Sequence, residues 1–217
     1  MDVTIIEVDK EKKTWVNPCI AYNIGFERAA GDIVIIQNPE SFHVGDVILH
    51  AANNVTDKNY LSYSCFGISY KITEQIRNLW DSDFQGVKNI LNGLQASHPK
   101  LSDWVGWYNH SRYRPNAFHW SSAITLKNLR AIEGFDSRYA NGYSWDDDGF
   151  VLRIRSEGLK IQIVPEKLAY VVHQQHPRKD RPTSFAYPIN KVNYTLYNKL
   201  KKEYEKKQGK TFSVLGD

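Results

Sequence analysis

The feature that most constrains the fold is an unbroken apolar run over residues 33–36, which ends abruptly in the polar residues 37–40. Such a run of Ile and Val is typical of a strand that is buried on both faces of an α/β sheet. A predicted strand over residues 3–8 and a predicted helix over residues 21–30 precede it. This order predicts a parallel sheet whose ligands bind beyond the carboxyl ends of the strands. Residues 37–43, which begin with this polar stretch, are therefore a candidate site.

The rest of the chain continues to alternate between helical and extended patterns. We expect helices over residues 44–53, 73–95, 126–132 and 146–158, and strands over residues 60–68, 121–125, 161–164 and 169–172. Residues 104–113 mix aromatic and polar side chains without a regular period, which indicates a functional loop. No repeat or break in composition marks a second domain, and 217 residues suffice for one buried core. We therefore expect a single α/β domain.

The net charge is +4, and lysines gather near the carboxyl end. Tyr194, Tyr197 and Leu200 recur among them at helical spacing, so we expect an amphipathic basic helix and tail over residues 186–217. A basic helix face usually meets water, and weak contact with a membrane surface is the alternative. The charge does not indicate nucleic-acid binding.

The chain has two cysteines, Cys19 and Cys65, without the spacing of a zinc site or a disulfide framework. No apolar run approaches the ~20 residues that span a bilayer. Residues 1–10 also lack the apolar core of a signal peptide. We therefore expect a cytoplasmic protein.

The strongest candidate for catalysis is the acidic run Asp146, Asp147 and Asp148, which Trp145 precedes. Three carboxylates at the predicted start of a helix interact favourably with the helix dipole, so N-terminal capping is the alternative interpretation. Capping needs only one or two acids, however. A third acid, crowded beside Trp145, favours a carboxylate that acts as a general base.

The sequence around this run resembles the acceptor-side half of glycosyltransferases of the GT-A type, notably the galactosyltransferase-like carboxy-terminal domain. The resemblance rests on Gly-Phe-Asp at residues 134–136, on Gly142, and on the acids and the following Arg within residues 146–153. In that family the second acid of the run deprotonates the acceptor hydroxyl in inverting transfer, and the first helps to hold the acceptor sugar. The resemblance implies these roles for Asp147 and Asp146, respectively.

The amino-terminal part resembles family-2 glycosyltransferases through a second motif, Asn-x-Gly followed by Ala-x-Gly-Asp and an apolar strand. The matching residues are Asn23, Gly25, Ala29, Gly31 and Asp32. Together the two motifs imply a GT-A (Rossmann-like) fold with a mixed, mostly parallel sheet flanked by helices. They also imply a nucleotide-sugar donor, in the first place a UDP-sugar, and a glycan acceptor.

The residues after the apolar strand depart from the family, whose members usually carry Asp-x-Asp to hold a divalent metal against the donor diphosphate. This chain has Gln37, Asn38 and Glu40 there, which are the candidate donor-binding residues. Oxygen ligands suit Mg²⁺ and Mn²⁺, and Glu40 is the candidate metal ligand. A solvated turn that ends the strand at Pro39 is the alternative.

A pair of histidines follows the last predicted strand. In several GT-A families a His at this point completes the metal shell, so the resemblance makes His173 the first candidate ligand and His176 the second. A hydrogen-bonded structural histidine is the alternative. Arg178 follows and is a candidate for contact with the donor phosphates. The implied cofactor is Mn²⁺ or Mg²⁺.

Aromatic residues near and within the acceptor-side half are candidates to contact the acceptor sugar, because ring faces stack on apolar sugar faces. Packing in the core is the alternative for each ring. The candidates, with one adjoining acid, are Trp107, Tyr108, Trp120, Trp145 and Asp148.

The front of the chain is short by comparison with family 2, in which an initial βαβ unit precedes the Asn-x-Gly motif. Here a single predicted strand, residues 3–8, precedes Asn23 and corresponds to the third strand of the usual order. A partner or an upstream segment would then supply the missing strands, and Asp9 would replace an acid of the base pocket. We divide the domain into a donor-side half, residues 1–100, and an acceptor-side half, residues 101–185.

These observations favour a hexosyltransferase-like enzyme that transfers a sugar from a nucleotide donor to a glycan hydroxyl. The departure at Gln37 and the short front also allow a non-catalytic carbohydrate- or nucleotide-binding module derived from the same fold. A metal-dependent hydrolase that uses the same acids and His173 is disfavoured, because the sequence has no His-Glu-x-x-His motif.

Overall fold

The computed structural model describes residues 3–176, 188–209 and 211–212 of the chain. They form two compact units, each assembled from separate stretches of sequence. The helical unit consists of the described parts of Met1–Asp32, Leu126–Glu157 and Arg181–Phe212, and the sheet unit of those of Ile33–Thr125 and Gly158–Asp180. Within the described residues, no helix has both the length and the apolar character needed to cross a membrane.

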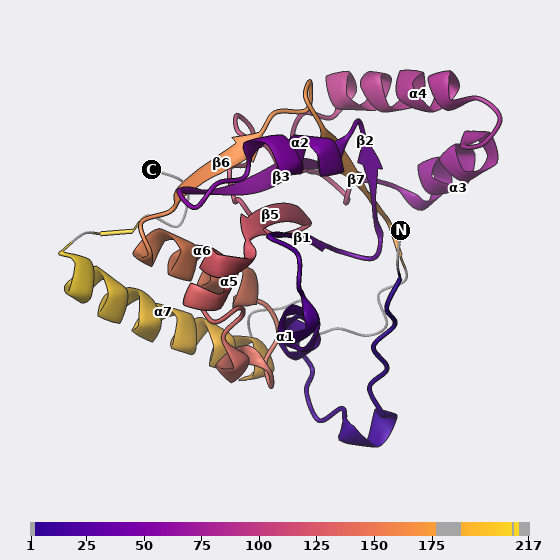
Figure 1. The fold of residues 1–217 in the computed structure, drawn as a ribbon. Helices are drawn as coiled ribbons and strands as arrows, with labels where there is room; N and C mark the ends of the chain where they lie inside the picture. Colours follow the sequence, from indigo (N-terminus) through magenta and orange to yellow (C-terminus); the bar gives the residue numbers. More distant parts are fainter. Residues whose placement is uncertain (1–2, 177–187, 210, 213–217) are drawn as a thin grey trace. The chain divides into compact units, whose positions relative to one another are not determined.

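The sheet unit is built on a mixed sheet, which has seven strands within the described residues (Figure 1). The hydrogen-bonded order is β1-β5-β3-β7-β2, and β4 and β6 also pair with β3. β3 is therefore the central strand, and all of its residues are buried. The strands are β1 (Ile33–Gln37), β2 (Ser41–Val44), β3 (Asn59–Ile68), β4 (Gly106–Asn109), β5 (Ser121–Thr125), β6 (Lys160–Val164) and β7 (Tyr170–Gln174).

The central strand changes its neighbours halfway along. Its first half pairs with β6 in parallel and with β5 antiparallel, and its second half pairs with β7 in parallel and with β4 antiparallel. β1 pairs with β5 and β2 with β7, both antiparallel. The expected mixed sheet flanked by helices is confirmed, but antiparallel pairings outnumber parallel ones among the described strands. An apolar run indicates a buried strand without indicating its direction, which is why the expected excess of parallel pairing was not met.

Alternate side chains of β3 point to opposite faces of the sheet, and helices cover both faces. Tyr63 packs in a cluster with α2 (Val47–Asn54). Phe66 points the other way and packs in a second cluster with α3 (Tyr70–Leu79) and α4 (Phe84–Ser97). This double coverage accounts for the complete burial of the central strand.

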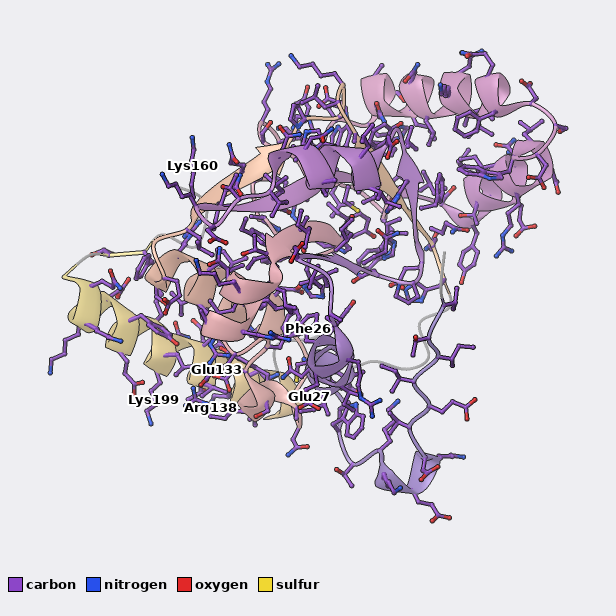
Figure 2. All side chains as sticks on the ribbon, viewed as in Figure 1. Phe26, Glu27, Glu133, Arg138, Lys160 and Lys199 are labelled. Carbon is purple, nitrogen blue, oxygen red and sulfur yellow. The ribbon has the colours of Figure 1, made fainter. Side chains whose placement is uncertain are left out.

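The helical unit is organised around Phe135. The ring of Phe135 stacks on Phe150, with 4.3 Å between ring centroids, and on Tyr22, with 5.2 Å. Phe26 also stacks on it, at 6.0 Å. Figure 2 labels Phe26, which belongs to α1. The helices of the unit are α1 (Cys19–Arg28), α5 (Leu126–Ala131), α6 (Asp146–Ser156) and α7 (Pro188–Gln208), with short 3-10 helices η1 (Lys10–Lys12) and η2 (Ser137–Tyr139).

The amino-terminal segment differs from the prediction. Residues 3–8 form no strand, and Val3 and Ile5 are 75% and 80% exposed. An apolar, β-branched run becomes a strand only where a neighbour supplies hydrogen bonds and a buried face. None of the described strands pairs with this segment. The assignment of residues 3–8 as the third strand of the family order is therefore wrong.

Two predicted helices also differ in extent. The helix expected over residues 73–95 is divided into α3 and α4, because Asp83 accepts a hydrogen bond from Gly86 N and caps a new helix. The helix expected from residue 44 begins at Val47, after the strand β2. The amphipathic helix near the carboxyl end is confirmed as α7. The remaining strands are confirmed to within two residues at 33–36, 60–68, 121–125, 161–164 and 169–172.

Candidate functional site

A tight turn between β1 and β2 carries Glu40. Within this turn Ser41 N donates a hydrogen bond to Asn38 O at 3.1 Å. Gln174 N donates to Glu40 O at 3.0 Å, and Ser41 lies opposite His173 in the pairing of β2 with β7. The register of the sheet thus brings Glu40 to the end of β7, where the predicted histidine ligands begin.

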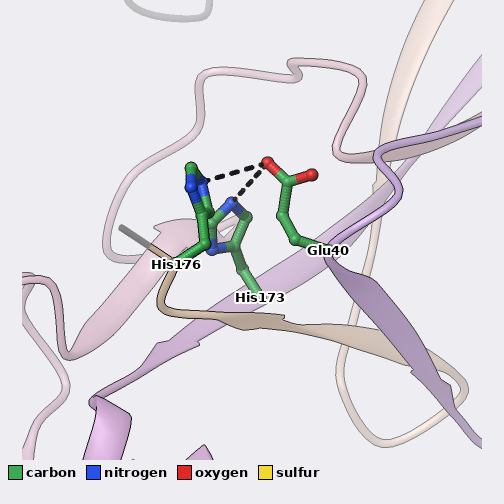
Figure 3. Close-up of side chains that lie close together, drawn as sticks. All are labelled: Glu40, His173 and His176. Atoms are coloured by element: carbon green, nitrogen blue, oxygen red, sulfur yellow. Dashed lines mark ion pairs between the residues drawn. The ribbon is translucent and has the colours of Figure 1, made fainter. Parts of the chain in front are cut away.

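Glu40, His173 and His176 form a compact cluster that could hold a metal ion, hereafter the metal-binding cluster (Figure 3). Nε2 of His173 lies 3.3 Å from Oε1 of Glu40, and Nε2 of His176 lies 3.5 Å from the same oxygen. The His173 side chain is 7% exposed, whereas those of Glu40 and His176 are 26% and 39% exposed. The cluster is therefore anchored by a buried histidine and is open to solvent through its other two members.

The three side chains fit a divalent metal ion. Their ligand atoms all lie within 4.8 Å of one another. Two ligands of a tetrahedral ion are about 3.4 Å apart when each lies about 2.1 Å from the metal, close to the 3.3 and 3.5 Å found here. Imidazole nitrogens suit transition metals, whereas Mg²⁺ prefers an all-oxygen shell. A donor set of two imidazoles and one carboxylate thus suits a transition metal better than Mg²⁺.

The surroundings keep the carboxylate of the cluster ionised. A hydrogen bond from His173 lowers the pKa of Glu40 to about 2, against the effect of burial, which raises it. The ring of Tyr108 packs against that of His173, with 5.1 Å between centroids. Without a metal, the same positions of His173 and Glu40 are those of a hydrogen-bonded pair. The structure thus brings all three predicted ligands together.

The other polar residues of the turn hold its shape. Nε2 of Gln37 donates a hydrogen bond to Ser41 O at 2.6 Å, and Oε1 of Gln37 lies 2.8 Å from Nε2 of His43. The backbone N of Asn38 donates to Trp120 O at 3.1 Å. Both ends of the Gln37 amide are therefore engaged within the turn, which supports a structural role for it. Donor contact by the Asn38 side chain stays a prediction.

The acidic run opens α6 in the helical unit, and its three acids differ in environment. Asp146 is 6% exposed, and its Oδ1 accepts a hydrogen bond from Nδ2 of Asn17 at 2.8 Å. This bond ties the start of α6 to the residues that precede α1, and it leaves Asp146 little surface for an acceptor sugar. Asp147 and Asp148 are half-buried. Asp147 therefore retains the access to solvent that a base for an external hydroxyl needs.

The backbone that leads into the acidic run is unusual. Ser144 and Trp145 both have positive φ, 61° and 69°, a conformation that costs a non-glycine residue about 1–3 kcal/mol. The Trp145 ring lies against Tyr194 and Tyr197 of α7, with 4.8 and 5.2 Å between centroids. α7 thus contacts the residue that immediately precedes α6. Contact of Trp145 or Asp148 with the acceptor stays a prediction.

Two of the aromatic residues expected to contact the acceptor lie in the core of the sheet unit. Trp107 is 2% exposed and packs edge-on against Phe66 and Tyr170. Tyr108, its neighbour on β4, is 6% exposed. Burial leaves neither ring a free face for a sugar, so core packing is the role that the structure supports. Trp120 is half-buried, and its predicted contact is not tested.

Asp9 and Arg178 are the remaining candidates for donor binding. Asp9 belongs to the helical unit and forms an ion pair with Lys12 at 2.7 Å, with its side chain 69% exposed. Arg178 lies outside the described residues. Donor binding by either residue stays a prediction.

A pocket of about 320 Å³ opens in the helical unit between α1 and α5. Phe26 and Glu27 line one wall, and Glu133 lines another. Gly134, the first residue of the Gly-Phe-Asp motif, also lines the pocket, whereas no acid of the run does. The sequence did not indicate this pocket, because its walls come from segments far apart in the chain.

Comparison with known proteins gives matches among solved structures alone, since no family model and no curated protein matches the chain. The catalytic domain of Drosophila β1,4-galactosyltransferase 7 in complex with xylobiose has a TM-score of 0.49 and 17% identity, over 83% of this chain and 60% of that one. A mutant of the same enzyme in complex with manganese, UDP-Gal and xylobiose has a TM-score of 0.47 and 16% identity, over 82% and 60%. The chain is thus similar to about 60% of the length of these galactosyltransferase domains.

Proposed function

We propose that this chain is a glycosyltransferase that moves a sugar from a nucleotide-sugar donor, in the first place a UDP-sugar, to a glycan hydroxyl. The observation that carries the proposal is the metal-binding cluster of Glu40, His173 and His176. It lies at the strand ends where the motif resemblance expects the donor diphosphate. The half-buried Asp147, at the position of the general base in the same resemblance, supplies the second requirement.

The proposed chemistry is an inverting displacement. The Asp147 carboxylate accepts the proton of the acceptor hydroxyl, whose oxygen forms a bond to the anomeric carbon of the donor sugar. The bond from that carbon to the diphosphate breaks, and the nucleoside diphosphate leaves with the bonding electrons. Attack from the side opposite the leaving group inverts the anomeric configuration.

The metal-binding cluster serves the leaving group in this proposal. A divalent ion, when bound, neutralises negative charge on the diphosphate. Glu40, His173 and His176 would hold it, and their two imidazoles favour Mn²⁺ over Mg²⁺. The low pKa of Glu40 keeps its carboxylate ready to bind a cation throughout the neutral range.

The test is transfer from a panel of UDP-sugars and other nucleotide sugars to glycan acceptors in the presence of Mn²⁺. The variant Asp147→Asn should lower kcat by at least 10²–10⁴-fold, because an amide cannot accept the proton. The matched control Asp148→Asn removes the same charge from the same helix turn and should change the acceptor KM at most. Full turnover by Asp147→Asn, with its fold intact by circular dichroism, would refute the assignment.

A second candidate function is a non-catalytic carbohydrate- or nucleotide-binding module. The observation that favours it is Gln37, which stands where family members carry an acid and whose amide is engaged within the turn. Calorimetric titration with nucleotide sugars, with and without Mn²⁺, followed by an assay of donor hydrolysis, separates the two functions. Binding without transfer or hydrolysis favours the module.

The cellular setting belongs to the same proposal. We propose a cytoplasmic protein. Weak attraction of α7 to anionic membranes is part of it, since this helix carries six Lys against two Glu. Sedimentation with vesicles that contain phosphatidylserine, at low and high salt, tests the last point.

A further inference from the structure

A buried asparagine of α7 reaches the loop that leads into the acidic run. Asn193 is 0% exposed, and its Nδ2 donates hydrogen bonds to Tyr139 O at 3.1 Å and to Ser144 O at 2.9 Å. A side-chain amide has two donor protons, and both have an acceptor here. One amide group therefore joins the two ends of the loop over residues 140–143.

The loop closes tightly around this amide. A Cβ atom at Gly142 would lie 2.3 Å from Oδ1 of Asn193, closer than real side chains approach. Gly142 therefore has no room for a side chain unless the amide moves. The glycine of the sequence motif thus packs against the asparagine of α7, a contact between residues far apart in the chain.

α7 also restrains the strained backbone of Ser144 and Trp145, which follow this loop. A strained conformation persists only where surrounding contacts fix it. Asn193 fixes the carbonyl group of Ser144, and Tyr194 and Tyr197 lie against the ring of Trp145. Both positive-φ residues before α6 are thus held by side chains of α7.

We propose that Asn193 is a positioning residue, which fixes the direction in which α6 begins and hence where the Asp147 carboxylate points. Asp147 is the second residue of α6, so a change in the backbone of Ser144 or Trp145 displaces it directly. The inference rests on the proposed function, in which Asp147 accepts the acceptor proton. A displacement of about 1 Å at a reacting group costs roughly 10²-fold in rate.

The variant Asn193→Asp tests this role, because it keeps the shape of the side chain and replaces its donors with an oxygen that repels both carbonyl groups. The matched control is Asn198→Asp on the same helix, since Nδ2 of Asn198 donates to Tyr194 O at 2.9 Å within α7 itself. For Asn193→Asp, kcat should fall by about 10²-fold. The donor KM and the Mn²⁺ affinity should not change, because the metal-binding cluster belongs to the sheet unit. Asn198→Asp should change none of these quantities.

Hydrogen exchange provides a readout that does not depend on transfer. The amides of residues 140–149 should exchange faster in Asn193→Asp than in the wild type, and at the wild-type rate in Asn198→Asp. Gly142→Ala disturbs the same contact from the side of the loop, and it replaces Asn193→Asp as the test if that variant does not fold. It should likewise lower kcat and speed the exchange of residues 140–149.

The possible outcomes separate this inference from the proposed function. Unchanged exchange in the variants of Asn193 and Gly142 would overturn the restraint of the loop. Faster exchange with an unchanged kcat would overturn its link to Asp147. A wild-type protein without transfer activity would refute the proposed function and with it the catalytic link, while exchange would still decide whether Asn193 holds the loop.

Discussion

The metal-binding cluster and the acidic run are created by the fold in different ways. The cluster joins a turn residue, Glu40, to histidines far along the sequence, and the pairing of β2 with β7 brings them together. The acidic run consists of consecutive residues, and one loop sets its orientation. The cluster should therefore respond to changes in the sheet unit, and the run to changes in the helical unit.

The largest difference between the two regions is expected for His173→Ala, which removes the buried imidazole of the metal-binding cluster and should weaken Mn²⁺ binding. Loss of a residue that merely supports a metal ligand costs about 10–100-fold in affinity, and loss of the ligand itself should cost more. Calorimetric titration with Mn²⁺ measures this change. Asp147→Asn is the control and should bind Mn²⁺ like the wild type. Equal affinities for the wild type and His173→Ala would show that the cluster is only a hydrogen-bonded pair.

The next largest effect is expected on the free energy of unfolding, when one acid of the run is compared with another. Asp146→Ala should lower the free energy of unfolding by about 1–3 kcal/mol, because it leaves the buried amide of Asn17 without its acceptor. Asp148→Ala, at a half-buried position in the same turn, should cost clearly less. Urea unfolding followed by circular dichroism compares the two. An equal loss in both variants would argue against a structural role for Asp146.

A smaller effect is expected from Gln37→Ala in the turn that carries Glu40. The loss of the hydrogen bond to Ser41 O should cost about 1 kcal/mol of stability and lower the Mn²⁺ affinity by less than His173→Ala does. Parallel titrations with Mn²⁺ and with a UDP-sugar distinguish two roles. A weaker affinity for the nucleotide sugar at unchanged Mn²⁺ affinity would restore Gln37 as a direct donor contact.

The smallest effect is expected from Asp9→Ala. The ion pair of Asp9 with Lys12 is largely exposed, and exposed pairs contribute little to stability. The thermal unfolding midpoint and the donor KM should both stay at wild-type values. A rise in the donor KM at unchanged stability would instead support the predicted contact with the nucleotide.

Much of the fold could be predicted from the sequence, because buried strands have a strong apolar pattern. The run at 33–36 is an example, and it also located Glu40 at a strand end. The short β2 was not predicted, because the polar–apolar alternation of Ser41–Val44 lasts for only four residues, and the antiparallel pairing to β7 was missed with it. The residues at 3–8 have the pattern of a strand, but none of the strands in the described part of the chain pairs with them.

The candidate site was predictable to a similar extent. The proximity of Glu40, His173 and His176 could be anticipated, because family motifs and strand ends coincide there. The contacts of Asn17 and Asn193 were not found, because an asparagine in a polar stretch gives no sign of which backbone or carboxylate it will meet. Trp107 was misjudged for the opposite reason, since an aromatic side chain suits a sugar and a core equally well.

The arrangement of β3 has a consequence for how the nascent chain matures. β3 is complete at Ile68, but its parallel partners β6 and β7 begin only at Lys160 and Tyr170. A chain still on the ribosome would hold β3 with one open edge until these segments emerge, and long-range strand pairing is slow and prone to aggregation. We expect chaperones to bind such intermediates, and chains that stop before Lys160 to be insoluble. The metal-binding cluster, which needs β7, would be among the last features to form.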